Sequence, residues 1–221
     1  MCGRFTLTKP PDIITQHFGL AGHGGMDALC MPRYNIAPTQ TIFALRHIEG
    51  RRELIPARWG LIPAWAKNAN APLINARADT LALKPSFREA FRQRRCLIPA
   101  DGFYEWQPAG KRKQPWFISL VNQEVFAFAG LWEAWRAPDG TLTPTCAIIT
   151  TTPNERLASI HDRMPAIIPP AAYDEWLVGD NPAALLAPYP AEAFQLHPVA
   201  ATVSSPRNDS PECNQAVALT P

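Results

Sequence analysis

The sequence has no apolar run that approaches the roughly 18 residues required to cross a membrane, although 47% of its 221 residues are hydrophobic. The N-terminus also lacks a basic region followed by an apolar stretch, the pattern of a secretory signal. We therefore expect a protein of the cytoplasm that has no membrane partner. Internal repeats, low-complexity tracts and obvious linkers are absent as well. We expect a single domain over residues 1–221, and a monomer.

Net charge is also small. Lys and Arg number 21 against 19 Asp and Glu, so the formal net charge is +2. Bulk charge of this size gives little electrostatic steering toward a nucleic acid. Any DNA binding must therefore depend on a local group of basic residues.

Cysteine is scarce, and its spacing is not that of a disulfide framework or a zinc site. The five cysteines are odd in number and far apart, and they form no C-x-x-C pair. We expect no metal and no organic cofactor. The cysteines are Cys2, Cys30, Cys96, Cys146 and Cys213. Cys96 and Cys146 lie in the apolar runs RCLIPA and TCAIIT, and we expect both to be inert core thiols.

Cys2 differs from those two because no apolar run accounts for it. It follows Met1 directly in the opening MCGRF. Once Met1 is removed, residue 2 carries a free α-amine and a thiol on adjacent carbons. That pair can act as two nucleophiles supplied by one residue.

The 24 prolines disfavour long helices, and short apolar, β-branched and aromatic runs favour strands. The expected strands are Thr41–Leu45, Leu54–Trp59, Cys96–Ile98, Phe103–Trp106, Trp116–Val121, Val125–Leu131, Thr145–Thr150 and Phe194–Val199. The expected helices are Asp12–Phe18, Ser86–Gln93, Asn154–Ile160 and Ala171–Leu177. These elements predict an α+β fold, mainly an antiparallel sheet or barrel with short peripheral helices.

Two local patterns give finer predictions. PWFISLVNQEVFAFAGLW has apolar residues on both sides of Asn122–Gln123, which favours a β-hairpin turning at that pair. Ser86 and Glu89 have the S-x-x-E spacing of a helix capping box.

Three polar positions lie where a core would not require them. Asn75 and Arg77, in PLINARADT, would share one face of an extended segment, although a turn-capping Asn and a surface Arg also explain them. Glu105, between two aromatics in FYEW, is either an outward-facing strand residue or an acid whose pKa is raised by poor solvation. His161, in SIHDRMP, is either a structural histidine or a proton shuttle beside a loop.

Motifs along the whole chain resemble the SRAP family, whose members are associated with the SOS response and process abasic sites in DNA. The resemblance runs in order from residue 2 to about residue 209. Its motifs are MCGRF, RYNIAPTQ, RWGLIPAWAK, LINARADT, RCLIPADGFYEW, QPWFI, FAGLWE, IITTTPN, IHDRMPAII and HPVA. Residues 19–32 (GLAGHGGMDALCMP) match no motif, and we assign them no role.

The resemblance implies a single SRAP domain that forms a covalent link between its N-terminal cysteine and an abasic site in single-stranded DNA. Carried onto this sequence, the catalytic residues are Cys2, Asn75, Glu105 and His161. The DNA-binding residues are Arg4, Trp65, Asn75, Arg77 and Arg163. Ala66 stands where some members have a second tryptophan beside Trp65.

The chemistry of an abasic site suits Cys2. The sugar equilibrates with a ring-opened aldehyde, which a neutral α-amine can attack to form a Schiff base. The thiol then adds to the imine and closes a five-membered thiazolidine, a step favoured because it is intramolecular. An α-amino pKa of about 7.7–8.0 leaves part of the amine neutral at pH 7.

Two other classes of function remain open from the sequence. An N-terminal-nucleophile peptidase or amidohydrolase would use the same thiol and amine to attack an amide, and removal of Met1 by the protein itself would be a limited version. A non-catalytic single-strand-binding module would leave Cys2 without a role. Covalent trapping on abasic DNA, but not on intact DNA, separates these classes.

Overall fold

The computed structural model describes residues 2–20, 31–110, 112–122 and 124–219. The region 19–32, which matched no motif, falls mostly outside them, as do Cys30 and Gln123.

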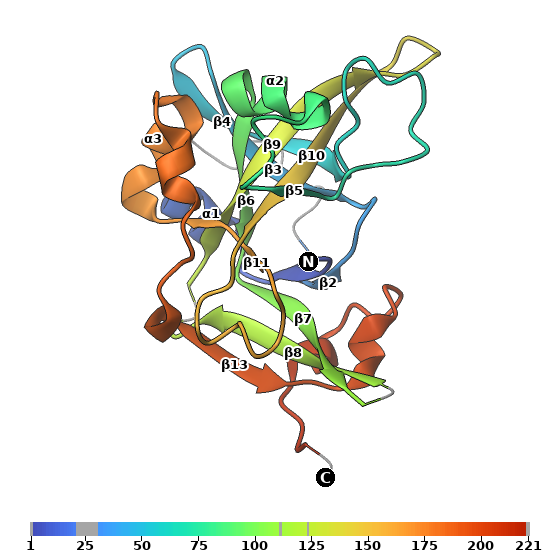
Figure 1. Ribbon diagram of the computed structural model, residues 1–221, viewed down its shortest axis with the longest axis vertical. Helices are drawn as coiled ribbons and strands as arrows, with labels where there is room; N and C mark the ends of the chain where they lie inside the picture. Colours follow the sequence, from blue (N-terminus) through green and yellow to red (C-terminus); the bar gives the residue numbers. More distant parts are fainter. Residues whose placement is uncertain (1, 21–30, 111, 123, 220–221) are drawn as a thin grey trace.

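Five strands form a closed barrel, which is the larger part of the molecule (Figure 1). Neighbouring strands follow the order β10-β4-β3-β6-β9, and β9 pairs again with β10. All of these pairings are antiparallel except that of β4 with β10. The strands are β3 (Thr41–Ile48), β4 (Arg51–Trp59), β6 (Arg95–Ala100), β9 (Phe126–Arg136) and β10 (Leu142–Thr151). Shorter strands extend this sheet: β5 (Asn75–Arg77), β11 (Met164–Pro165) and β12 (Ile167–Ile168).

The barrel is filled because its strands are apolar over long runs. β6 is buried at every position, and β9 is buried at most of its positions. Gly130 lets β9 pack closely against β6, since a Cβ at this position would lie only 2.8 Å from the sulfur of Cys96. Cys96 and Cys146 are both 0% exposed, so their prediction as core thiols is confirmed.

A second sheet of five strands lies below the barrel in Figure 1, in the order β13-β8-β7-β1-β2. Its strands are β1 (Phe5–Leu7), β2 (Arg33–Ile36), β7 (Gly102–Ala109), β8 (Arg112–Leu120) and β13 (Phe194–Pro198). Phe5 joins the two halves, because its ring packs edge-on against Trp59 and Phe128 of the barrel strands.

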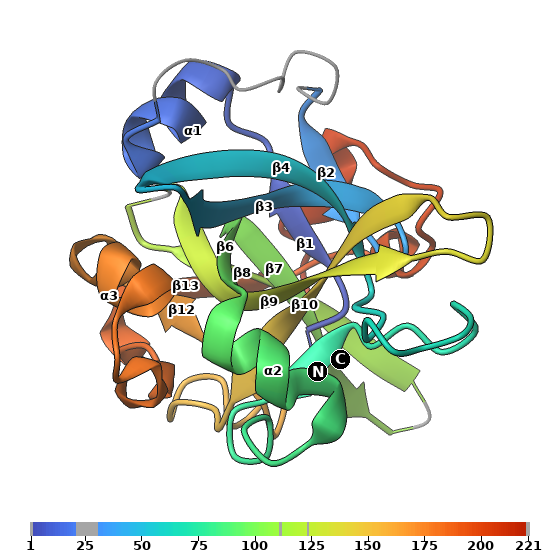
Figure 2. The same cartoon turned by 90° about the horizontal axis from the view of Figure 1, so that it is seen from above.

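Short helices lie around the strands, as Figure 2 shows from above. The α-helices of the described residues are α1 (Pro11–Phe18), α2 (Pro85–Gln93) and α3 (Tyr173–Val178). Short 3-10 helices are η2 (Pro170–Ala172), η3 (Pro182–Leu186), η4 (Ala191–Ala193), η5 (Ala201–Ser204) and η6 (Pro211–Asn214). The predicted fold class, mainly antiparallel with a barrel and short peripheral helices, is confirmed. No helix of the described part is long and apolar enough to span a membrane.

The predicted hairpin at Asn122–Gln123 is wrong. β8 pairs with β7 and β13, whereas β9 pairs with β6, β10 and β12, so the two arms belong to different sheets. Both arms carry long apolar runs because each strand is largely buried. Such runs show that a strand is buried, but they do not identify the strand beside it.

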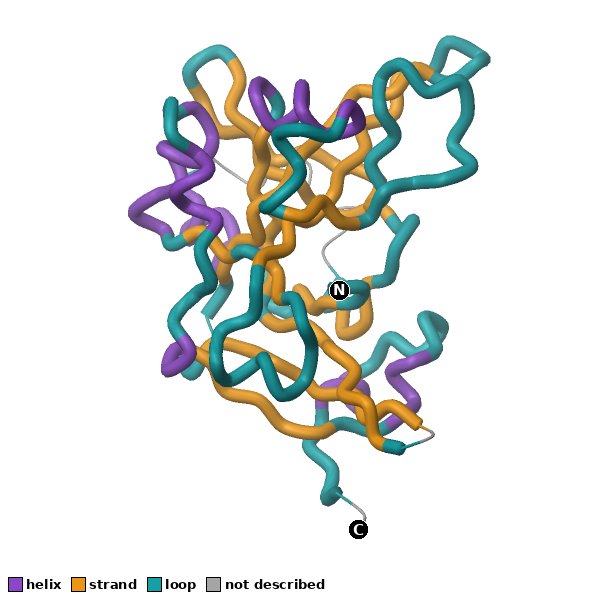
Figure 3. Tube along the Cα trace, in the orientation of Figure 1, coloured by secondary structure: helices purple, strands orange, loops and turns teal. Residues whose placement is uncertain are grey.

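Two helix predictions also need correction. α2 begins at Pro85 after the N-cap residue Lys84, which makes no side-chain capping bond, so Ser86 lies inside the helix and forms no capping box. Residues 155–160 form successive turns, not a helix. The Asn154 side chain accepts the Leu157 N–H at 3.0 Å, as a helix N-cap does, but no helix continues beyond these turns. Figure 3 shows this loop descending from the barrel toward the lower sheet.

Candidate functional site

Cys2 lies in the main hydrophobic core and is 0% exposed. Its sulfur is 3.8 Å from the backbone oxygen of Arg4, which also accepts the N–H of Tyr104 at 3.0 Å. The sequence set Cys2 apart from the core thiols, but its side chain is as buried as theirs. Burial raises the pKa of the Cys2 thiol far above its ordinary value, and the neighbouring Glu105 raises it further. The thiol is therefore held in its neutral form.

Glu105 is brought to Cys2 by the pairing of β1 with β7. Phe5 pairs with Phe103 in antiparallel register, which places Glu105 opposite Gly3. Glu105 is 2% exposed, and burial raises its pKa from 4.5 to about 7. Of the two readings left open by the sequence, the structure supports the poorly solvated acid over the outward-facing strand residue. Such a carboxyl can both accept and donate a proton near neutral pH.

His161 completes this group from the loop that follows β10. Its Nε2 lies 3.9 Å from Oε2 of Glu105. Its Nδ1 lies 3.0 Å from the backbone nitrogen of Arg163 and 2.8 Å from Oδ1 of Asp162. One Nδ1 cannot both accept from the first and donate to the second. Because the Asp162 side chain is 86% exposed, we assign the bond with Arg163, which places the ring proton on Nε2, facing Glu105. Burial lowers the pKa of His161, in keeping with a neutral ring.

Asn75 lies on β5, which runs parallel to β10 with Asn75 opposite Ile148. Its side-chain nitrogen donates to the Ile148 carbonyl at 3.4 Å. Its side-chain oxygen is buried and has no hydrogen-bond partner among the described residues. Buried polar atoms in proteins are normally paired. Asn75 therefore has an acceptor that no described residue uses.

Arg77, on the same strand, is exposed and forms a two-bond ion pair with Asp79. Arg163, by contrast, has a side chain that is only 9% exposed. It donates to the backbone oxygen of Thr150 at 2.5 Å, and it approaches Asp79 at 3.5 Å. Arg77 and Arg163, two of the three arginines expected to bind DNA, thus share one carboxylate. The sequence analysis assigned Asp79 no role, although it stands two residues after Arg77 in the same motif.

Arg4 is used inside the protein. Its Nη1 donates to the Asn35 side chain at 2.8 Å and to the Val203 carbonyl at 2.6 Å, and its Nη2 donates to the Ser204 carbonyl at 2.8 Å. These bonds tie the first residues of the chain to the segment before the C-terminus. Its assignment as a phosphate contact stays a prediction.

Trp65 is 68% exposed on the loop between β4 and β5. The neighbouring Ala66 holds this loop against the barrel, because its carbonyl accepts the indole N–H of Trp135 at 2.8 Å. An exposed indole beside a fixed backbone can stack on a nucleic-acid base. The place of Trp65 in a site with Cys2, Glu105 and His161 also stays a prediction.

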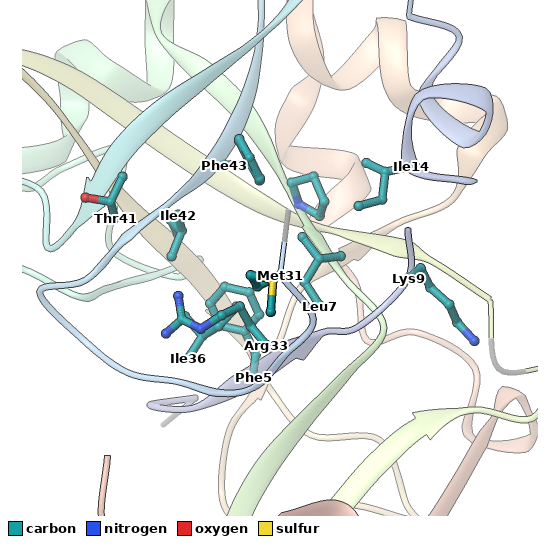
Figure 4. A pocket seen from close by; sticks show the side chains of 11 residues that line it. Phe5, Leu7, Lys9, Ile14, Met31, Arg33, Ile36, Thr41, Ile42 and Phe43 are labelled. Carbon is teal, nitrogen blue, oxygen red and sulfur yellow. The ribbon is translucent and has the colours of Figure 1, made fainter. Parts of the chain in front are cut away.

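No group of three or more His, Cys, Asp or Glu side chains in the described chain is arranged to hold a metal ion. A separate apolar pocket lies against β1, between α1, β2 and β3 (Figure 4). Phe5, Leu7, Ile14, Ile42 and Phe43 line it, and Lys9 stands at its edge. The lining includes none of the expected catalytic residues.

Comparison with known proteins points to one family. The family model described as SOS response associated peptidase (SRAP) matches residues 1–206. "Abasic site processing protein YoqW" of Bacillus subtilis is 44% identical over 96% of this chain and 98% of its own length. "Abasic site processing protein HMCES" of Xenopus tropicalis is 32% identical over 100% of this chain and 79% of its own. A crystal structure of a protein from Bacteroides thetaiotaomicron superposes with a TM-score of 0.89 at 26% identity, covering 98% of this chain and 100% of the other.

Proposed function

Because this chain belongs to the SRAP family, we propose that it processes abasic sites by a covalent reaction of Cys2 with single-stranded DNA. Removal of Met1 frees the α-amine of Cys2. The amine attacks the aldehyde carbon of the ring-opened sugar, and the carbinolamine loses water to give an imine. The thiol adds to the imine carbon, its proton passes to the nitrogen, and a thiazolidine results. One water is the only other product.

The chemistry of the two nucleophiles supports this order of events. Only the amine can react with the aldehyde and lose water to give an imine, and the thiol can close the ring only once that imine exists. The amine therefore attacks first. Once the imine has formed, the thiol is on the Cβ of Cys2, next to the Cα that carries the imine nitrogen. Its addition to the imine is therefore intramolecular and has a high effective molarity.

Glu105 and His161 have separate roles in proton transfer. With a pKa of about 7, Glu105 can act in both forms. The ionised carboxylate takes a proton from the attacking amine, and the neutral carboxyl gives a proton to the departing hydroxyl. His161, with its proton on Nε2, donates to the ring oxygen of the sugar as the aldehyde opens. Asn75 accepts a hydrogen bond from a sugar hydroxyl or from the Cys2 amine.

Binding of the strand is assigned to Arg4, Trp65, Arg77 and Arg163. The exposed guanidinium of Arg77 and the indole of Trp65 suit a phosphate and a base, and neither contact requires a particular sequence. Sequence-independent contacts fit a protein that must recognise damage at any position. We also propose that the protein is a single-domain monomer of the cytoplasm.

The observation that carries the proposal is the carboxyl of Glu105, buried beside Cys2 and 3.9 Å from His161, with its pKa near neutral. Mass spectrometry after incubation with an abasic oligonucleotide tests it. We expect a species that lacks Met1 and has gained the mass of the oligonucleotide less one water. An unmodified protein, or the same adduct with an intact oligonucleotide, would contradict the proposal.

Peptidase activity is the second candidate, because the matched family carries that description. A general peptidase must bind an unrelated peptide beside the Cys2 thiol, whereas removal of Met1 requires attack only on the bond that precedes Cys2. We propose that any such activity is limited to removal of Met1. Cleavage of unrelated peptides that depends on Cys2 would argue for a general peptidase.

A further inference from the structure

Asp79 occupies the place where two arginines would hold an anion. Its Oδ2 accepts from Nη2 of Arg77 at 2.7 Å, and its Oδ1 accepts from Nε of the same side chain at 3.2 Å. Nη2 of Arg163 lies 3.5 Å from Oδ1. Two parallel bonds from one guanidinium are the geometry with which arginine binds either a carboxylate or a phosphate. The carboxylate therefore satisfies the donors that a DNA phosphate would use.

Arg163 shows why an anion belongs at this position. Its side chain is 9% exposed, and its Nε is buried without a hydrogen-bond partner among the described residues. Burial lowers its pKa, and Asp79 acts in the opposite direction. A buried cation with an unused donor requires a negative partner. In the free protein the negative partner near Arg163 is Asp79. Its Oδ1 lies 3.5 Å from Nη2 of Arg163, which is longer than a good hydrogen bond.

Asp79 itself is not built into the interior. Its side chain is 49% exposed and that of Arg77 is 54% exposed, so both can move without opening the core. The hydrogen bond from Arg77 holds the pKa of Asp79 below its ordinary value, which keeps the carboxylate ionised. The contact is close in geometry but open to solvent and to competing anions.

We infer that Asp79 is a phosphate surrogate that lowers the affinity of the protein for intact single-stranded DNA. This inference rests on the proposed function. A phosphate that binds Arg77 and Arg163 must first displace the carboxylate. Intact DNA, which offers only reversible contacts, is therefore released readily, whereas an abasic site is retained by its bond to Cys2. Asp79 acts as a specificity determinant because it weakens reversible binding and leaves covalent capture to decide which strands are held.

The test compares Asp79→Asn with Asp180→Asn. Both remove one negative charge, but Asp180 is exposed after α3, where it acts on Arg95 and not on the pair Arg77 and Arg163. Affinity for a labelled, intact oligothymidylate is measured by fluorescence anisotropy at low and high salt. We expect Asp79→Asn to bind about threefold or more tightly at low salt, with a smaller gain at high salt, and Asp180→Asn to match the parent. Arg77→Ala in the Asp79→Asn background should abolish the gain.

A second arm separates this inference from the proposed function. Excess intact oligothymidylate should inhibit crosslinking to an abasic oligonucleotide more strongly for Asp79→Asn than for the parent. Equal or weaker binding by Asp79→Asn would overturn the inference, because Asp79 would then orient Arg77 for DNA. Loss of folding in Asp79→Asn would also overturn it, since Asp79 would be a structural counter-ion. A parent that neither binds nor crosslinks DNA would instead refute the proposed function.

Discussion

Replacement of Glu105 by Gln should stabilise the protein at alkaline pH. The folded protein holds the Glu105 proton up to about pH 7, whereas a solvated carboxyl releases it near 4.5. The stability that this proton contributes is full below about 4.5 and is lost as the pH rises through about 7. The difference between the two pKa values corresponds to about 3 kcal/mol once the group is ionised in both states. Gln removes this cost and keeps nearly the same shape.

The assay is urea unfolding of the parent and of Glu105→Gln at several pH values from 5 to 9. We expect the two free energies of unfolding to converge toward low pH, and the variant to be more stable by up to about 3 kcal/mol above pH 8. Glu192→Gln, an exposed change on η4, serves as the control and should follow the parent. A constant difference between Glu105→Gln and the parent across this range would show that Glu105 titrates normally, and would remove it as the neutral-pH acid.

His161→Ala should slow crosslinking to abasic DNA but leave the affinity for intact DNA unchanged, because the ring transfers a proton and is not a phosphate ligand. Single-turnover rates of crosslinking at pH 5 to 9 test this. A variant that reacts at the rate of the parent throughout this range would refute it. Arg77→Ala should weaken binding of intact single strands of any sequence and reduce its salt dependence by about one phosphate contact. A salt titration measures this, and an unchanged slope and affinity would remove Arg77 from the interface.

The strands could be predicted from the sequence where they are long and apolar. β3, β4, β6, β7 and β10 contain the segments expected from their composition, and β9 begins one residue later than expected. β1 and β5 were not predicted, because three-residue strands carry too little periodicity to be recognised. The failed hairpin between β8 and β9 has a different cause. Pairing depends on which strands meet in space, and an apolar run does not specify its partner.

The chemical types in the site could be predicted more readily than their environment. The position of Cys2 behind Met1 indicated its two nucleophiles, but not that packing against the core buries the thiol. The approach of His161 to Glu105 depends on a loop that brings together segments far apart in the chain. Asp79 was passed over because an acid near an arginine is common on protein surfaces, and only the position of Arg163 gives it meaning.

The central claim is that one residue supplies both the amine and the thiol. Cys2→Ala, with Met1 removed, keeps the α-amine and should still form an imine with an abasic oligonucleotide, but it cannot close the ring. Denaturing electrophoresis with and without borohydride is the direct test. We expect a heat-stable crosslink from the parent without reductant, and from Cys2→Ala only after reduction. A heat-stable crosslink from Cys2→Ala without borohydride, or from a parent chain that retains Met1, would contradict the thiazolidine mechanism.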